Sequence, residues 1–93
     1  MLKLSVQNGA DALHLLVEGR LVHPWTRELE TLWNELNKTL GARQLFLNLC
    51  GTTFIDRNGM QLLRSIVKAH NPIILADSPL TRQFAEQARQ AEA

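Results

Sequence analysis

The fold is decided by one stretch of the sequence, LFLNLCGTTFIDRNGMQLLRSIV, which covers residues 45–67. It opens with the apolar strand pattern of Leu45–Leu49, passes through Cys50–Ile55 and reaches the quartet Asp56–Gly59. A helical pattern begins at Met60. In an open α/β sheet, partners and ligands bind in the crevice beyond the carboxyl ends of the strands. The loop around Asp56 is therefore the first place to look for function.

Two strands are predicted before this stretch, because apolar and polar side chains alternate along it. Leu2–Gln7 shows the period-two pattern of a half-buried strand, and Asn8-Gly9 supplies a turn that tolerates positive φ. Ala12–Glu18 alternates again. The two segments are expected to form a hairpin.

An amphipathic helix is predicted from Pro24 to Leu40. Proline suits the first turn of a helix, and Gly41 stands where a left-handed residue ends one. The apolar side chains between them fall on one stripe at helical spacing: Trp25, Leu29, Leu32, Trp33, Leu36 and Leu40. Trp33 lies at the margin of the stripe, so it is the tryptophan expected to stay partly exposed and to anchor a partner.

The remaining elements complete an α/β domain. A buried helix is predicted at about Gly59–His70, followed by a short buried strand at Ile73–Ala76. Ser78-Pro79 then opens a last helix that buries Leu80, Phe84, Ala88 and Ala91. The order is β-β-α-β-α-β-α with a mixed four-stranded sheet, in which the strand entered at Leu45 runs parallel to an earlier one. Residues 1–93 form a single domain.

Composition disfavours several classes of function. The formal net charge is +1 and the basic residues are scattered, which argues against binding to nucleic acid. A single cysteine excludes an internal disulfide. The N-terminal residues lack the long apolar segment of a signal peptide or membrane span, so no direct membrane insertion and a cytoplasmic location are expected.

No group of residues has the spacing of a catalytic or metal site. Cys50 and the histidines His14, His23 and His70 form no Cys-x-x-Cys or His-x-x-x-His pattern, and the glycines form no phosphate-binding loop. Cys50 is interpreted as a small buried apolar residue. The sequence predicts no catalytic residue, no metal and no cofactor, and hence a protein that is not an enzyme.

The loop residues also have structural explanations. Asp56 precedes the free N–H groups of the second helix, where a carboxylate acts as a cap. Asn58 is an alternative cap, with Gln61 in the place of a capping-box residue. Gly59 permits close backbone approach. Arg57 has no evident structural role, which makes it a candidate contact residue.

The strand, the phenylalanine, the quartet and the apolar helix together resemble the STAS domain family, named for sulfate transporters and anti-sigma-factor antagonists. In that family the quartet is Asp-Ser-Ser-Gly or Asp-Thr-Gly-Gly. Here it is Asp56-Arg57-Asn58-Gly59, and the phosphorylatable hydroxyl of the family falls on Asn58. The predicted order of strands and helices agrees with the STAS fold over nearly the whole chain.

The resemblance implies a non-catalytic regulatory module similar to anti-sigma-factor antagonists, acting in signalling and regulation of transcription. Such a module docks onto an anti-sigma factor with kinase activity through this loop, and phosphorylation ends the complex. The corresponding partner-binding residues are Thr53, Asp56, Arg57, Asn58 and Gly59. Because asparagine has no hydroxyl, this copy is expected not to be switched at position 58.

Two alternatives remain open. The chain is also similar to the STAS subunits that bind the ATPase of lipid-transport ABC complexes. A second copy of the chain, in a homodimer, is a further candidate partner. From another class, a receiver-like protein would use Asp56 as phosphoacceptor, but it needs Mg²⁺ held by further carboxylates, and Asp77 is the main candidate for one.

Overall fold

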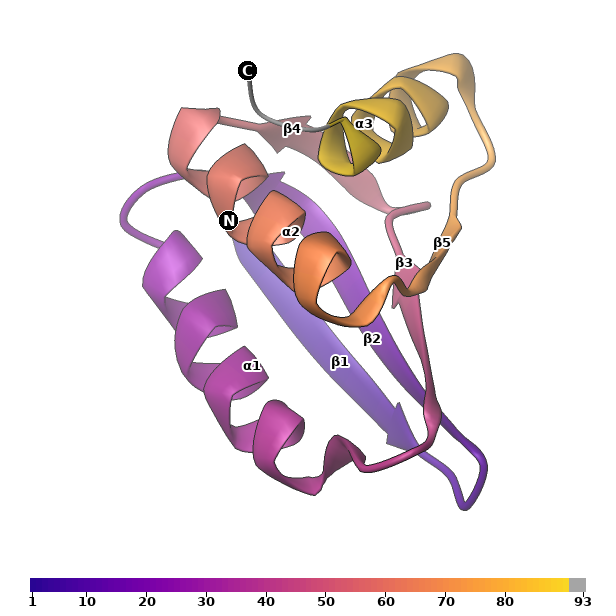
Figure 1. Ribbon diagram of the computed structural model, residues 1–93. Helices are drawn as coiled ribbons and strands as arrows, with labels where there is room; N and C mark the ends of the chain where they lie inside the picture. Colours follow the sequence, from indigo (N-terminus) through magenta and orange to yellow (C-terminus); the bar gives the residue numbers. More distant parts are fainter. Residues whose placement is uncertain (91–93) are drawn as a thin grey trace.

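The computed structural model describes residues 1–90 and contains a mixed sheet with three helices (Figure 1). The elements in chain order are β1 (Leu2–Asn8), β2 (Ala12–Leu21), α1 (Thr26–Leu40), β3 (Gln44–Asn48), β4 (Thr52–Ile55), α2 (Arg57–His70), β5 (Ile73–Leu75) and α3 (Pro79–Arg89). The predicted α/β class is confirmed.

The sheet is organised around β2, its longest strand. The main strand order is β1-β2-β3-β5, and β4 also pairs with β2. β1 is antiparallel to β2, as the predicted hairpin requires, whereas β3, β4 and β5 all join the sheet in parallel. β2 is long enough to pair with β3 along Ala12–Leu16 and with β4 along Gly19–Leu21. The parallel placement predicted for the strand entered at Leu45 is confirmed.

The predicted four-stranded sheet is wrong in one respect, because the sheet has five strands. The additional strand, β4, lies between Cys50 and the quartet, where the sequence predicts no strand. Its burial does not alternate, since Thr52 and Ile55 are buried and the two residues between them are exposed. The β2–β4 register also shifts between Gly19 and Arg20. This irregular pairing removes the period-two pattern by which a strand is recognised.

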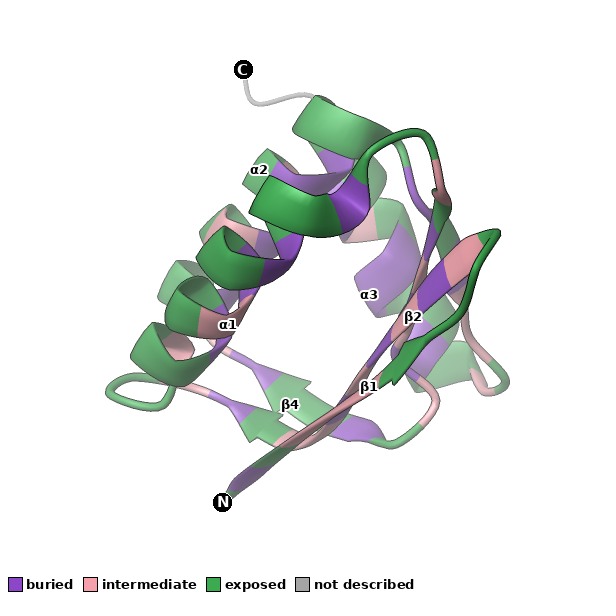
Figure 2. Ribbon diagram, turned by 90° about the horizontal axis from the view of Figure 1, so that it is seen from below, coloured by how far each residue is buried: buried purple, intermediate pink, exposed green. Residues whose placement is uncertain are grey.

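One face of the sheet carries the core. Leu13, Leu15 and Val17 of β2 are fully buried on it, with Leu45 and Leu47 of β3 beside them. Figure 1 shows α1 and α2 in front of the β1–β2 hairpin, and α2 contacts both α1 and α3. Figure 2 shows buried residues on the sides of the helices that face the sheet and exposed residues on their outer sides.

The alternate residues of the central strands face the other way and are only half-buried. On that face the rings of His14 and Phe46, register partners on β2 and β3, stack with 4.4 Å between their centroids. The sheet is thus fully buried on one side only.

The predicted apolar stripe of α1 is confirmed for four of its residues, but the exposed tryptophan is not the one that was expected. Leu29, Trp33, Leu36 and Leu40 are buried. The prediction that Trp33 is the exposed tryptophan is wrong, because it is 7% exposed and meets the His70 ring edge-on. Trp25 is 39% exposed. Its backbone N–H donates to the carbonyl of Val22 in a turn, so α1 begins only at Thr26.

The C-terminal elements show two further differences from prediction. Ser78 and Pro79 open α3 as expected, and Phe84 and Ala88 are buried, but Leu80 is 47% exposed. Thr81 takes the inward position instead, since its hydroxyl completes the capping box with Ser78. Ala91 lies outside the described residues.

The strand β5 was predicted to be buried, and only one of its faces is. Ile74 points into the core, whereas Ile73 is 44% exposed. The reason is that Ile73 is the register partner of Phe46, so its side chain lies on the half-buried face of the sheet, at an edge where β3 is the only neighbour among the described strands.

The position of Phe84 and Leu80 on α3 can be tested by truncation. We expect Phe84→Ala to lower the free energy of unfolding by about 3–5 kcal/mol, because it leaves a cavity in the core. Leu80→Ala should cost about 1 kcal/mol or less, because the side chain is already half in water. Urea unfolding followed by circular dichroism measures both. Equal losses for the two variants would contradict the orientation of α3.

Candidate functional site

The quartet lies at the N-terminus of α2, and Asp56 is its N-cap. One carboxylate oxygen, Oδ1, accepts the backbone N–H of Gly59 at 2.8 Å. The other, Oδ2, accepts the backbone N–H of His23, also at 2.8 Å. Asp56 therefore joins the turn that precedes α1 to the start of α2. The predicted cap is confirmed, whereas the alternative cap at Asn58 is wrong because α2 already begins at Arg57.

These hydrogen bonds determine the charge state of Asp56. Its partial burial by itself raises the pKa of the carboxyl group, but the lowering causes together outweigh that effect, led by the N–H groups of His23 and Gly59. The imidazole of His23 and the N–H of Asn58 add to the lowering. The pKa of Asp56 thus lies below its usual value, and the group is a carboxylate at neutral pH.

Gly59 packs the first turn of α2 against the end of β2. A Cβ atom built on Gly59 would lie 2.6 Å from the carbonyl oxygen of Leu21 and 3.0 Å from Cγ2 of Ile55. The close backbone approach predicted for this glycine is therefore observed. A side chain here would push the helix away from the sheet.

The other predicted contact residues are exposed. Arg57 and Asn58 occupy the first turn of α2, and Thr53 lies on β4 at the irregularity in its pairing with β2. Of the hydroxyl groups near the loop, that of Thr52 is buried and donates to the carbonyl of Val17 at 2.7 Å. The structure thus brings Asp56–Gly59 together and places Thr53 on the strand that leads into them.

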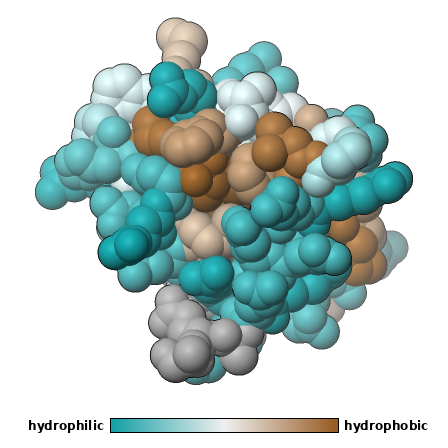
Figure 3. Space-filling view, turned by 90° about the horizontal axis from the view of Figure 1, so that it is seen from above, coloured by the Kyte–Doolittle hydropathy of each residue, from teal (hydrophilic) through white to brown (hydrophobic). Residues whose placement is uncertain are grey.

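Exposed aromatic residues flank the loop, and the sequence analysis did not identify them as site residues. Phe54, two residues before Asp56, is 48% exposed, and Trp25 follows the turn whose His23 is bound by Asp56. The guanidinium carbon of Arg20 lies 5.7 Å from the centroid of the Phe54 ring. Figure 3 looks onto the end of the molecule with β4 and the start of α2, and shows apolar side chains gathered in one area with hydrophilic ones around it.

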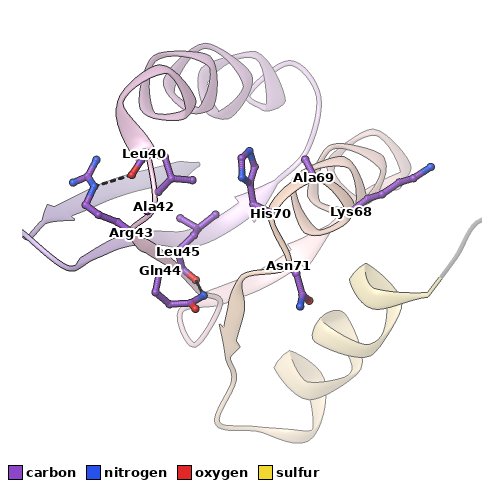
Figure 4. A pocket seen from close by; sticks show the side chains of 10 residues that line it. Leu40, Ala42, Arg43, Gln44, Leu45, Lys68, Ala69, His70 and Asn71 are labelled. Carbon is purple, nitrogen blue, oxygen red and sulfur yellow. Dashed lines mark hydrogen bonds between the residues drawn. The ribbon is translucent and has the colours of Figure 1, made fainter.

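One pocket is remote from this loop. It has a volume of about 420 Å³ and lies at the opposite end of α2, between Lys68–Asn71 and the segment Leu40–Leu45 (Figure 4). Arg43, which lines this pocket, makes hydrogen bonds within the protein. Its guanidinium donates to the carbonyls of Leu40 at 3.0 Å and Thr39 at 2.7 Å. These bonds satisfy the last carbonyls of α1, a structural role.

A second depression, of about 670 Å³, runs between α2 and α3. Arg64 on its wall donates to the carbonyl of Gln87 at 2.9 Å and so ties the two helices together. Its lining begins at Gln61 and includes no residue of the quartet.

Cys50 is half-buried at the end of β3 rather than fully buried as predicted. Burial raises the pKa of its thiol, and the neighbouring carboxylate of Asp77 raises it further. A thiol with a raised pKa is a poor nucleophile at neutral pH. Within residues 1–90 no three His, Cys, Asp or Glu side chains are grouped so that they could hold a metal ion.

Comparison with known proteins identifies the fold. No protein-family model and no curated protein sequence matches the chain. Among solved structures, the unphosphorylated anti-sigma factor antagonist SpoIIAA aligns with a TM-score of 0.62 over 92% of this chain and 82% of its own, at 16% identity. The chain has the SpoIIAA-like fold. The predicted STAS-like fold is thereby confirmed.

Two other solved structures are similar to this chain. An uncharacterized protein from Shewanella loihica, itself described as having that fold, aligns with a TM-score of 0.61 over 94% of this chain and 76% of its own, at 12% identity. Mglu aligns with a TM-score of 0.60 over 81% of this chain, at 20% identity, and the chain spans only 19% of Mglu. No helix among the described residues of this SpoIIAA-like fold is long and apolar enough to cross a membrane.

The lowered pKa of Asp56 predicts how its contribution depends on pH. A carboxyl group whose folded pKa lies below its unfolded value of about 3.9 stabilises the fold fully above that value and loses the effect as pH falls through the folded pKa. We expect Asp56→Asn to be less stable than wild type at pH 7 by about 1–2 kcal/mol, because the amide has no charge and only one acceptor oxygen for the two N–H groups. The difference should shrink toward pH 2.

Urea unfolding at a series of pH values measures this difference, with Glu30→Gln on the exposed side of α1 as the control for loss of a carboxylate. A gap that stays constant down to pH 2 would show that the charge of Asp56 does not contribute.

The packing of Gly59 predicts a cost for any side chain there. Alanine favours helix by about 1 kcal/mol over glycine, but the added methyl group would press on the backbone oxygen of Leu21. We expect Gly59→Ala to lower the free energy of unfolding by about 1–3 kcal/mol, as overpacking does. Gln61→Ala, at an exposed position of the same helix, should change it by about 0.5 kcal/mol at most. A stabilised Gly59→Ala variant would refute the close contact.

Proposed function

We propose that this chain is a non-catalytic protein-binding regulatory module that docks a partner through the loop at the N-terminus of α2. Thr53, Asp56, Arg57, Asn58 and Gly59 form the docking loop. The similarity to SpoIIAA, an anti-sigma factor antagonist, supports a partner of the anti-sigma factor or switch-kinase type. That similarity extends over most of both chains, as expected for proteins built as the same single module.

The observation that carries the proposal is the contrast between a fixed loop backbone and free side chains. Asp56 binds N–H groups on both sides of the loop, and Gly59 locks the helix against β2. Within residues 1–90, however, the exposed side chains of Arg57 and Asn58 make no hydrogen bond or ion pair. A preorganised surface with unused polar groups loses little entropy when a partner binds.

The same geometry gives no support to Asp56 as a receiver-like phosphoacceptor. A phosphoacceptor needs a carboxylate oxygen that is free to attack, and both oxygens of Asp56 accept backbone N–H groups. The carboxylate serves here to hold the loop, and the binding contacts fall to its neighbours.

Asn58 determines how such a module is regulated. In the family that the sequence resembles, this position carries the hydroxyl that is phosphorylated. A phosphate would bring a charge of about −1.5 to −2 to the first turn of α2. The amide of Asn58 is neutral and accepts no phosphate, so the loop remains in the form that binds. If phosphorylation regulates this chain, the exposed hydroxyl of Thr53 is the nearest candidate in the loop.

Asn58→Asp tests the docking loop by adding a charge with almost no change in volume. The first turn of α2 contains no acidic residue, so the new carboxylate should raise stability by about 0.3–1 kcal/mol. Partner binding should nevertheless weaken tenfold or more, equivalent to about 1.4 kcal/mol. Arg57→Ala should weaken binding as well, because it removes a contact and leaves the cap intact.

The measurement is affinity capture from the organism's own cells, with tagged wild type and variants compared by quantitative mass spectrometry. Asn34→Asp supplies the matched control, since it makes the same change at an exposed position of α1. Proteins captured equally by wild type, Asn58→Asp and Arg57→Ala would place the interface elsewhere and leave the loop a purely structural element.

A further inference from the structure

We infer that the docking surface extends from the loop onto the Arg20–Phe54 pair and selects a protein partner that presents carboxylates around an apolar socket. The inference rests on the proposed function and names the chemistry of the partner. It adds two residues, one from β2 and one from β4, to the five of the docking loop.

The pair is formed by the pairing of β2 with β4. Arg20 and Phe54 are register partners, and both side chains are exposed. The guanidinium lies over the ring with its central carbon 5.7 Å from the centroid, within the range of a cation–π contact. A stacked guanidinium is held in place, yet its N–H donors still point outward from its edge.

Neither arginine of this surface has an acidic partner in the described part of the chain. The one ion pair within residues 1–90 joins Lys38 and Glu35 on α1. The carboxylate of Asp56, next to Arg57, has both oxygens bound to backbone N–H groups. Glu18 lies on the same side of β2 as Arg20, but its register partner on β1 is Lys3, which offsets its charge.

Phe54 supplies the apolar part of the contact. It is 48% exposed, and the area of Figure 3 in which apolar side chains gather lies at its end of the molecule. Arg57 follows Phe54 by three positions, so their Cα atoms lie at most about 11 Å apart at 3.3–3.6 Å per residue. Aromatic and arginine side chains are the commonest residues to dominate binding energy in protein interfaces. A partner surface of ordinary size is wide enough to reach both arginines and the ring.

The charge pattern favours carboxylates of a protein over other anions. A guanidinium matches a carboxylate through two parallel hydrogen bonds. Nucleic acid and anionic membranes are bound by clusters or stripes of several cations, whereas this surface has two arginines, one of them stacked on a ring, and the whole chain has a net charge of only +1. An acidic protein surface with a socket for Phe54 is the partner that fits.

Photo-crosslinking with the full chain tests the inference. The benzophenone amino acid p-benzoylphenylalanine is incorporated at position 54 in one variant and at position 58 in another, and each is irradiated in the organism's own cells. The attached species is identified by mass spectrometry.

The identified protein is then purified and titrated with wild type, Arg20→Glu, Arg57→Glu and the control Lys68→Glu, which reverses an exposed charge at the far end of α2. Circular dichroism checks that each variant is folded, and Arg20→Gln replaces Arg20→Glu if it is not.

We expect the same protein to be attached at both positions. Its affinity should fall at least tenfold for Arg20→Glu and Arg57→Glu, stay within twofold for Lys68→Glu, and decrease as salt is added. Replacing the partner's contacting Asp or Glu by Lys should restore binding to Arg20→Glu.

Different results of these experiments would overturn the inference alone or the proposed function with it. A protein attached at position 58 but not at 54, or bound equally well by Arg20→Glu, would leave the docking loop standing and overturn the extension to Arg20 and Phe54. Attachment of no protein at either position, or of nucleic acid, lipid or a second copy of this chain, would overturn both.

Discussion

The Asp56 carboxylate is the interaction on which the geometry of the site depends. Its two oxygens hold N–H groups that are far apart in sequence, one in the turn before α1 and one in the first turn of α2. The backbone N–H of Asp56 in turn donates to the carbonyl of Leu21 at 3.1 Å, so the end of β2 belongs to the same cluster. Because Gly59 allows α2 to touch Leu21, these bonds form without a gap between helix and sheet. A residue that usually only caps a helix here fixes three segments at once.

The parts of the fold that were predicted from the sequence are those specified by local patterns. The hairpin, the start of α3 at Ser78-Pro79 and the cap at Asp56 each depend on residues close together in the chain. The errors arose where distant residues decide. Trp33 is buried because His70 of another helix lies against it, and Ile73 is exposed because it shares the half-buried face of the sheet with Phe46 of another strand. Periodicity identifies an apolar face but not what covers it.

The residues of the candidate site likewise fall into those that local sequence predicts and those that depend on distant residues. Asp56–Gly59 could be located from one contiguous quartet because a cap, a glycine and an exposed arginine follow each other there. Arg20 and Phe54 could not, since their meeting requires that β4 exists, that it pairs with β2, and that its register shifts after Gly19. Without the shift, Arg20 would face Thr53 rather than the ring. The same register shift that removes the period-two pattern of β4 therefore also brings Arg20 to the Phe54 ring.

A permanently neutral residue at position 58 changes what the surrounding charges do. Where this position carries a phosphorylatable hydroxyl, a phosphate would bring a charge of about −1.5 to −2 to the start of the helix and so change the charge of the surface. In this chain the one acidic group of the loop is committed to backbone N–H groups, and nothing at position 58 can offset the arginines. On the proposed docking surface their attraction for carboxylates is then constant. If the chain binds its partner as proposed, binding is controlled by the amount of partner or by salt rather than by modification of position 58.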